Sequence, residues 1–116
     1  PSEHIRLIHP VFPNTSVSGG LGDHCLVSQV FPGPTPETTV TRQSIMCAKK
    51  PETNEELAHT KAFSDLVLMA VKDEDYHMGF QIQKTLASKA NEAFVFGRNE
   101  PALQHYHDHV AKFAGE

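Results

Sequence analysis

The stretch ETTVTRQSIMCAKKPETNEELAHTKAFSDLVLMAV (37–71) contains the change of pattern that decides the fold. Up to about residue 50 the chain is rich in β-branched residues, proline and glycine, a composition typical of strands and turns. Beyond residue 53 the apolar residues recur at i, i+3, i+4, i+7 and i+8, as in an amphipathic helix: Phe63, Leu66, Val67, Ala70 and Val71. Strands followed by helices predict an α+β fold, an antiparallel sheet with C-terminal helices that cover one of its faces.

Three runs have the alternation and composition of strands: HIRLIHPVF (4–12), HCLVSQVF (24–31) and ETTVTRQSIMCAK (37–49). We expect Pro10 and Pro13 to bound the first strand, because proline cannot donate to a sheet ladder. The glycine-rich segment SVSGGLGD (16–23) predicts the turn between the first two strands. Alternation places four residues of the third run on one face: Thr39, Thr41, Gln43 and Ile45.

Three helices are expected in the second part of the chain. Thr53 and Glu56 form a capping-box pattern, in which the hydroxyl and the carboxylate each accept from one free backbone N–H. The segment VKDEDYHMGFQIQKTLAS (71–88) predicts a second helix. The sequence NEP predicts the start of a third, with Asn99 as its cap and Pro101 in its first turn.

The composition argues against several classes of function. The 116 residues have a net charge of −4 and no cluster of lysine and arginine of the kind that binds nucleic acid. The longest apolar run, LVLMAV (66–71), is too short to span a bilayer, and the sequence opens with no signal-peptide pattern. Cys25 and Cys47 have no CxxC pairing, which indicates reduced thiols and a cytoplasmic protein.

The predicted second helix begins with three acids close together, Asp73, Glu74 and Asp75. With each residue advancing about 100° around an α-helix, Asp75 lies within a quarter turn of an apolar stripe that the other two acids avoid. That stripe consists of Met78, Gly79, Ile82, Gln83 and Leu86. The spacing therefore predicts that Asp75, alone of the three, is directed toward the interior.

Two interpretations of Asp75 remain open at this point. Acids in the first turn of a helix are favoured by the macrodipole and by capping, which requires no further function. A carboxylate that faces a core must instead be paired, protonated or bound to metal, because an isolated buried charge is too unfavourable. Gln83 is near the same face and is a candidate hydrogen-bonding neighbour. The residues alone lead to a metal ligand, a buried ion pair or a cap.

The histidine tract HYHDH (105–109) has the look of a metal site, since His105 and His109 share a helix face. It lacks the glutamate of an HExxH motif, and a solvated helix end is the preferred interpretation. His24 and Cys25 are neighbours in a predicted strand and point to opposite faces, so they cannot hold one ion together.

Four strings carry a resemblance to a known family: HPVFPNTSV (9–17), QVFPGPTPETTVTRQ (29–43), DEDYHMGFQIQKTLAS (73–88) and FGRNEPALQHYH (96–107). In order and spacing they resemble the C-terminal part of the catalytic domain of Rieske-type ring-hydroxylating oxygenases, in the large (alpha) subunit. The resemblance covers nearly the whole chain. It implies a helix-grip (START/SRPBCC-like) domain, in which an antiparallel sheet wraps a long helix and leaves a pocket for an apolar substrate.

In that family two histidines and one carboxylate hold a mononuclear non-haem iron, Fe(II), and leave positions open for oxygen. The family's carboxylate stands in an acid pair followed some eight residues later by glutamine, a pattern that maps onto Glu74-Asp75 and Gln83. The resemblance thus implies that Asp75 is the iron ligand and catalytic carboxylate. It also makes Val71 and Val67 candidates for substrate contact, with core packing as the alternative.

Two parts of the family pattern are missing from residues 1–116. The CxH…CxxH pair that holds the [2Fe-2S] cluster does not occur. The two iron histidines stand upstream of the matching region, and His4 and His9 cannot replace them, because an odd separation in a strand puts them on opposite faces. We therefore interpret residues 1–116 as the C-terminal portion of the catalytic domain, inactive alone.

The resemblance implies that the whole enzyme hydroxylates an aromatic or other apolar substrate with dioxygen and with electrons from NAD(P)H. Its implied partners are the rest of the alpha subunit, further alpha subunits in a trimer, beta subunits, and a ferredoxin or reductase. Neither nucleic acid nor a membrane is among them. The alternative is a free-standing helix-grip-like module that binds a hydrophobic small molecule without catalysis, with Asp75 as a cap.

Overall fold

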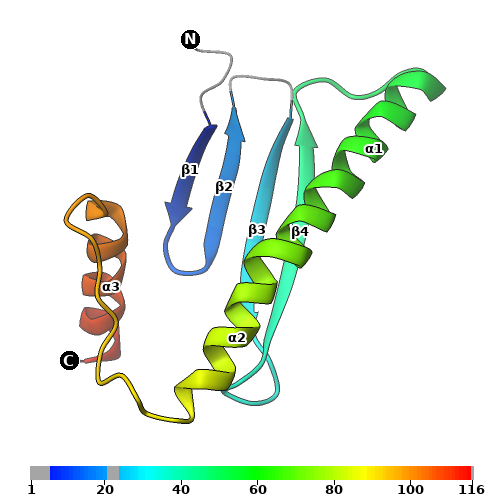
Figure 1. Ribbon diagram of the computed structural model, residues 1–116. Helices are drawn as coiled ribbons and strands as arrows, with labels where there is room; N and C mark the ends of the chain where they lie inside the picture. The colour runs from blue at the N-terminus through cyan, green and yellow to red at the C-terminus, as the bar shows by residue number, and fades with distance from the viewer. Residues whose placement is uncertain (1–5, 21–23, 116) are drawn as a thin grey trace.

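The computed structural model describes residues 6–20 and 24–115, which form a sheet, a long helical rod and a separate C-terminal helix (Figure 1). The strands are β1 (Arg6–Val11), β2 (Thr15–Gly20), β3 (His24–Pro32) and β4 (Thr39–Cys47). All neighbouring pairs are antiparallel, in the order β1-β2-β3-β4. The expected α+β fold with an antiparallel meander followed by helices is confirmed.

The first half of the sheet differs from the prediction, because most of the segment expected to be a turn (16–23) is strand β2. Gly19 lies opposite Cys25, and a Cβ on Gly19 would come within 3.1 Å of the Cys25 Cβ. This glycine thus permits a close approach of two strands, which is a second use of glycine besides turns. Residues 21–23 of the expected turn, like residues 4 and 5 of the expected first strand, lie outside the described residues.

Pro10 does not end β1, contrary to the prediction. It lies within the strand and opposite Ser16 of β2. Strand β1 is the last strand on its side of the described sheet, and an edge strand tolerates proline because one row of its backbone groups needs no partner. The chain turns back after Val11, before β2 begins at Thr15.

The helical part is one continuous rod where two helices were expected. Helix α1 (Asn54–Ala70) runs directly into a π-helical turn, η2 (Val71–Tyr76), and then into α2 (His77–Leu86), with no break between them (Figure 1). The predicted capping box is confirmed at the start of the rod. The Thr53 hydroxyl accepts from the Glu56 N–H (3.1 Å), and the Glu56 carboxylate accepts from the Thr53 N–H (3.2 Å).

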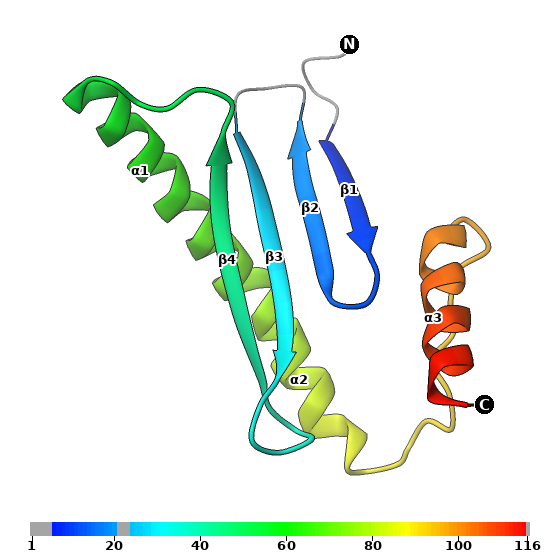
Figure 2. The same cartoon turned by 180° about the vertical axis from the view of Figure 1, so that it is seen from behind.

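The rod crosses one face of the sheet, which we call the inner face. This face carries alternate residues of each strand, among them His24, Ser28 and Gln43. The ring of His24 lies 4.9 Å from that of Phe63 on α1, and Gln43 is hydrogen-bonded to Tyr76 at the end of η2. Seen from behind, the opposite face of β3 and β4 has no helix over it (Figure 2).

Helix α3 (Pro101–Ala114) lies beside the β1 edge, away from the rod (Figure 1). Its Tyr106 hydroxyl donates to the Pro13 carbonyl, and its Phe113 ring is 5.2 Å from Phe12. The predicted N-cap of this helix, Asn99, differs from the observed N-cap by one residue. Glu100, not Asn99, is the N-cap, and its carboxylate accepts from the Gly97 N–H at 2.7 Å.

These layers enclose no closed core. Among the described residues none is buried, and the chain exposes 9856 Å². A compact monomer of 12.8 kDa would expose about 6,300 Å². The radius of gyration, 17.1 Å, likewise exceeds the roughly 13 Å expected for 116 residues. The chain alone therefore leaves much of its apolar surface without a partner.

Candidate active site

The acids Asp73, Glu74 and Asp75 lie in η2, in the middle of the rod. All three are exposed. The 17 residues of α1 separate them from the N-terminus of the rod, whereas the favourable field of the macrodipole is confined to the first turn. Capping was the open alternative for these acids, and their position in the structure removes it.

The helical wheel was wrong about which residue faces the sheet. Asp75 is exposed, and its neighbour Tyr76 is half-buried and contacts β4. Gly79 and Gln83, both in the predicted stripe, line a cavity of about 550 Å³ with Tyr76, Phe80 and the threonines of β4, so this part of the stripe does face the sheet. Asp75 and Tyr76 belong to the π-helical turn, whose i→i+5 bonding departs from the 100° step assumed for an α-helix, whereas the rest of the stripe lies in α2.

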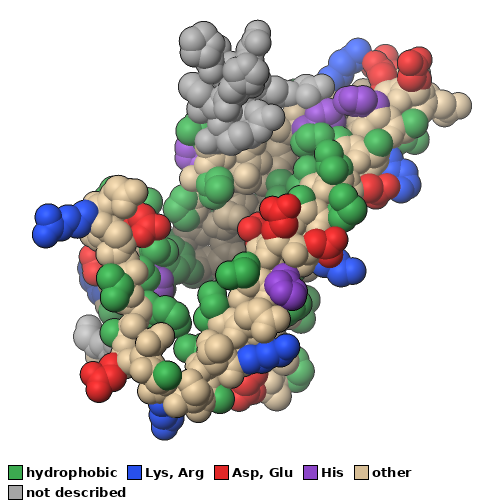
Figure 3. Space-filling model, in the orientation of Figure 1, with side chains coloured by type: hydrophobic (Ala, Val, Ile, Leu, Met, Phe, Trp, Pro, Cys, Tyr) green, Lys and Arg blue, Asp and Glu red, His purple; other side chains and the backbone are tan. Residues whose placement is uncertain are grey.

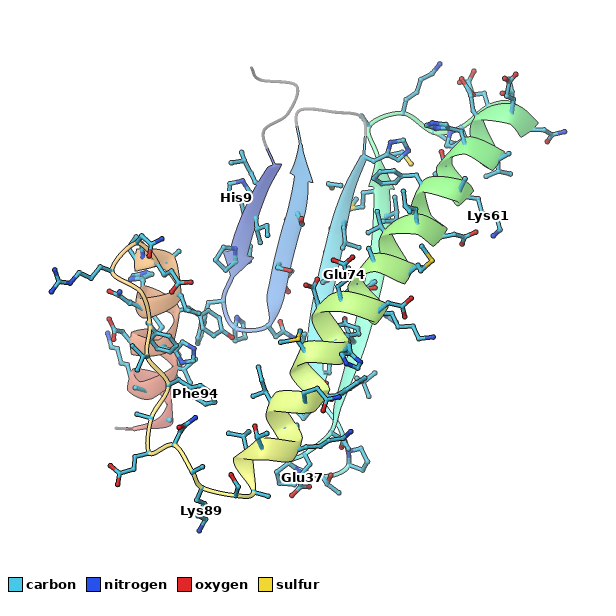
Figure 4. The ribbon with its side chains drawn as sticks, viewed as in Figure 1. His9, Glu37, Lys61, Glu74, Lys89 and Phe94 are labelled. Carbon is cyan, nitrogen blue, oxygen red and sulfur yellow. The ribbon has the colours of Figure 1, made fainter. Side chains whose placement is uncertain are left out.

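Gln83 does not pair with Asp75 as the sequence suggested. Within residues 6–20 and 24–115, the Asp75 carboxylate makes neither a hydrogen bond nor an ion pair. It is therefore an accessible carboxylate with its oxygens uncommitted. Figure 4 shows the adjacent Glu74 at the edge of the rod that borders the open centre of the molecule.

A hollow opens between the inner face of the sheet and α3, with a volume of about 890 Å³ (Figure 3). We call it the central hollow. Its lining is mixed: Ile8, Pro10, Val30, Ala102 and Leu103 are apolar, and Asn14, Thr15, Ser16, Ser28, Asn99, Glu100 and Tyr106 are polar. Both its size and its combination of apolar surface with a few polar groups are typical of small-molecule sites.

A row of polar side chains crosses the inner face at the floor of the central hollow. Ser16 lies opposite Ser28, and Ser28 lies opposite Gln43. The Gln43 amide donates to the Ser28 hydroxyl (3.4 Å) and to the Tyr76 hydroxyl (3.3 Å). We call Ser16, Ser28, Gln43 and Tyr76 the polar row. It connects the floor of the hollow to the residue next to Asp75.

The sequence pattern missed the polar row as a site. Alternation had correctly placed Gln43 with Thr41 and Ile45 on one face, and all three are half-buried. A glutamine on the face directed toward helices was an available signal, because buried polar groups need hydrogen-bond partners.

The donor set of the described residues fits part of a metal site. Among them no group of three or more His, Cys, Asp and Glu side chains could hold an ion. Asp75 offers one accessible carboxylate, which suits the single acidic position of a two-histidine-one-carboxylate site. Such a site would need at least one histidine from outside the described residues.

The histidine tract of α3 is used for packing. The His109 ring is 4.3 Å from His105, and its Nδ1 lies 2.9 Å from the His105 carbonyl oxygen. His107 stacks on Phe96 at 4.7 Å. His109 is half-buried near Phe12, so the expectation of a wholly solvated helix end was only partly right.

The remaining candidates have these positions. Val67 and Val71 are both half-buried on the rod, and their contact with substrate stays a prediction. Cys25 and Cys47 are free thiols on opposite faces of the sheet, since they pair with Met46 and His24 in adjacent register positions. None of the helices in the described part of the chain is long and apolar enough to cross a membrane.

Residues 2–116 match the family described as ring hydroxylating alpha subunit (catalytic domain). The match extends over almost the entire chain. The chain belongs to this family. No curated protein and no solved structure matches it. Membership of the ring-hydroxylating alpha subunits supports an oxidoreductase role. The α+β arrangement, with one long helix crossing an antiparallel sheet, is consistent with the helix-grip architecture expected for such a catalytic domain.

Proposed function

We propose that this chain is the C-terminal portion of the catalytic domain of a Rieske non-haem iron oxygenase alpha subunit, and that it supplies Asp75 to the iron. The enzyme would hydroxylate an aromatic or other apolar substrate with dioxygen and with electrons from NAD(P)H. The observation that carries the proposal is the family match together with one accessible carboxylate, uncommitted among the described residues, in a π-helical turn of the rod that crosses the sheet.

The π-helical turn supports the choice of this segment. Single π turns inside α-helices are rare and occur frequently at functional sites. Here the turn contains the three acids and Tyr76, and among the described residues no cap or ion pair of Asp75 explains it. Glu74 is its immediate neighbour at the edge of the open centre, which makes Glu74 the proper comparison for Asp75 in any test.

The chain's own residues would perform three tasks. The Asp75 carboxylate would hold the iron with two upstream histidines that are not in this chain. Iron held in this way would supply the activation of dioxygen. Apolar side chains that line the central hollow, such as Val30 and Leu103, would orient the substrate and exclude water from it. Tyr76 would hold the acid-bearing turn against β4 through Gln43.

The splayed layers support a larger assembly over the free-standing module. The exposed area exceeds that of a compact monomer by roughly 3,500 Å², an area comparable to an obligate interface. We propose that the rest of the alpha subunit covers much of it, with further alpha subunits in a trimer and with beta subunits. Electrons would come from a Rieske [2Fe-2S] domain served by a ferredoxin or reductase, in the cytoplasm. A self-sufficient binding module would be expected to bury a core of its own.

The decisive experiment compares Asp75→Asn with Glu74→Gln in the complete alpha subunit. Both changes remove one negative charge and keep the side-chain shape. We expect Asp75→Asn to lose mononuclear iron and turnover while it keeps the visible absorption of the [2Fe-2S] cluster, and Glu74→Gln to keep all three. Full iron content in Asp75→Asn, with loss in Glu74→Gln, would move the ligand by one residue. Full iron content and turnover in both would reject the acid cluster as the iron site.

A further inference from the structure

The polar row has a chemistry that the iron site does not require. A site for a purely hydrocarbon substrate would have no need of polar groups beside Ile8, Pro10 and Val30, as hydrocarbon gains nothing from hydroxyl and amide groups that must be desolvated. Here Ser16 and Ser28 both line the central hollow, and both are half-buried. They lie opposite one another on adjacent strands, so their side chains stand side by side on the inner face.

The direction of the hydrogen bonds decides what the row can offer to a ligand. The Gln43 amide nitrogen has two hydrogens and donates one to Ser28 and one to Tyr76. Ser28 therefore acts as an acceptor toward Gln43 and keeps its own hydrogen. In the part of the chain that the structure describes, the Ser28 hydroxyl donates to no other group. An unused O–H donor thus faces the hollow.

The charges around the hollow restrict the ligand further. Neither lysine nor arginine lines it among the described residues. The one acid among the described lining residues is Glu100, whose carboxylate is engaged by the Gly97 N–H at 2.7 Å. Arg42 belongs to the same strand as Gln43 but is its direct neighbour and points to the opposite face. A carboxylate or sulfonate group would find no cation here, whereas a neutral oxygen would find the Ser28 donor.

We propose that the polar row is a specificity subsite that binds a neutral oxygen acceptor on the substrate, such as a ring carbonyl, ether or hydroxyl group. Ser28 donates the hydrogen bond to that oxygen. Gln43 is a positioning residue, because it holds the Ser28 hydroxyl in its acceptor orientation and is itself held by Tyr76. This inference rests on the proposed function and narrows its substrate class from apolar compounds to oxygen-bearing aromatic ones.

The test compares two ligands of the same shape, acetophenone and α-methylstyrene, which differ by C=O in place of C=CH₂. Their dissociation constants are measured by calorimetry on the complete alpha subunit without oxygen, so that no turnover is needed. We expect acetophenone to bind roughly 2- to 12-fold more tightly, the range for one net hydrogen bond. Benzoate, the anionic analogue, should bind more weakly than acetophenone. Equal affinity of the first pair, or preference for benzoate, would overturn the proposal.

Variants of the polar row test whether it causes the preference for acetophenone over α-methylstyrene. Ser28→Ala should bring the ratio of the two affinities close to one while α-methylstyrene binds as before. Gln43→Met should lower the same ratio, which a merely structural role would leave unchanged. Ser44→Ala is the matched control, because Ser44 lies beside Gln43 on the opposite face of β4. If Ser28→Ala fails to fold, Ser28→Cys keeps the shape with a weaker donor and should give the same direction.

Two results in the variants would count against the subsite. An unchanged ratio in Ser28→Ala would show that another group recognises the oxygen. Equal weakening of both ligands would show that Ser28 only supports the fold. Neither result depends on iron, so failure of the subsite is distinguishable from failure of the Asp75 assignment, which is read from metal content.

Discussion

The helical rod contains two regions that resemble each other in sequence and differ in physics. Its start has Glu55 and Glu56 in the first turn, and its middle has three acids in η2. At the start, the Glu56 carboxylate accepts from the N–H groups of Glu52 and Thr53, at 2.8 and 3.2 Å. In the middle, the helix continues on both sides of η2, and within the described part of the chain no N–H donates to the Asp75 carboxylate. An acid cluster therefore acts as a cap only where free backbone N–H groups exist.

Among the changes proposed here, deletion of Lys72 from η2 is expected to have the largest effect. Because a π turn has one residue more per turn than an α-helix, the deletion should restore a regular helix and rotate everything beyond it. We expect Tyr76 to leave Gln43, a loss of about 1–3 kcal/mol in unfolding free energy, and loss of the bound iron. Metal content and chemical denaturation of the alpha subunit measure both effects. Lys72→Ala, which keeps the chain length, is the control and should leave both intact.

Thr53→Ala tests the other region and should have the next largest effect. It removes the hydroxyl that accepts from the Glu56 N–H, so one donor at the helix start loses its partner. The expected loss of stability is about 1 kcal/mol, within the usual range for an N-cap. Denaturation measurements should show this loss with iron content unchanged. A Thr53→Ala variant that lost iron would mean that the two regions of the rod are coupled.

The capping box also predicts a pH dependence. The Glu52 backbone N–H, followed by that of Thr53, holds the pKa of Glu56 below its ordinary value of 4.5. A carboxyl whose pKa is lower in the folded state stabilises the fold above its unfolded pKa, and this contribution is lost as the pH falls through the folded pKa. Stability should therefore decrease on acidification below about pH 4.5, and Glu56→Gln should show a shallower decrease over that range. Identical profiles for the two proteins would contradict this assignment.

The smallest effect is expected for Asp73→Ala. Asp73 is exposed in the middle of the rod, where it neither caps nor pairs among the described residues. Removing it should change the unfolding free energy by no more than about 0.5 kcal/mol. Thermal unfolding against the unaltered protein measures this. A loss of stability as large as that of Thr53→Ala would show that Asp73 stabilises the rod, contrary to this expectation.

The sequence by itself determined the features that depend on neighbours along the chain. The Thr53–Glu56 cap, the alternation of β4 and the proline at the start of α3 were all predicted correctly, because each involves groups within about four residues of one another. The order of four strings of residues was also enough to indicate the family, which the match over residues 2–116 then showed. These features depend on nearby residues or on the order of motifs along the chain, and both can be read from a single sequence.

Only the tertiary structure decided the features that depend on distant partners. Gly19 could be a turn or a close contact until Cys25 of the adjacent strand was in place beside it. The π turn was invisible to a wheel built on a constant step, and the residue of this turn that reaches the sheet is Tyr76, where Asp75 was expected. The polar row joins residues from β2, β3, β4 and η2, and its hydrogen bonds exist only because the sheet and the rod are packed together.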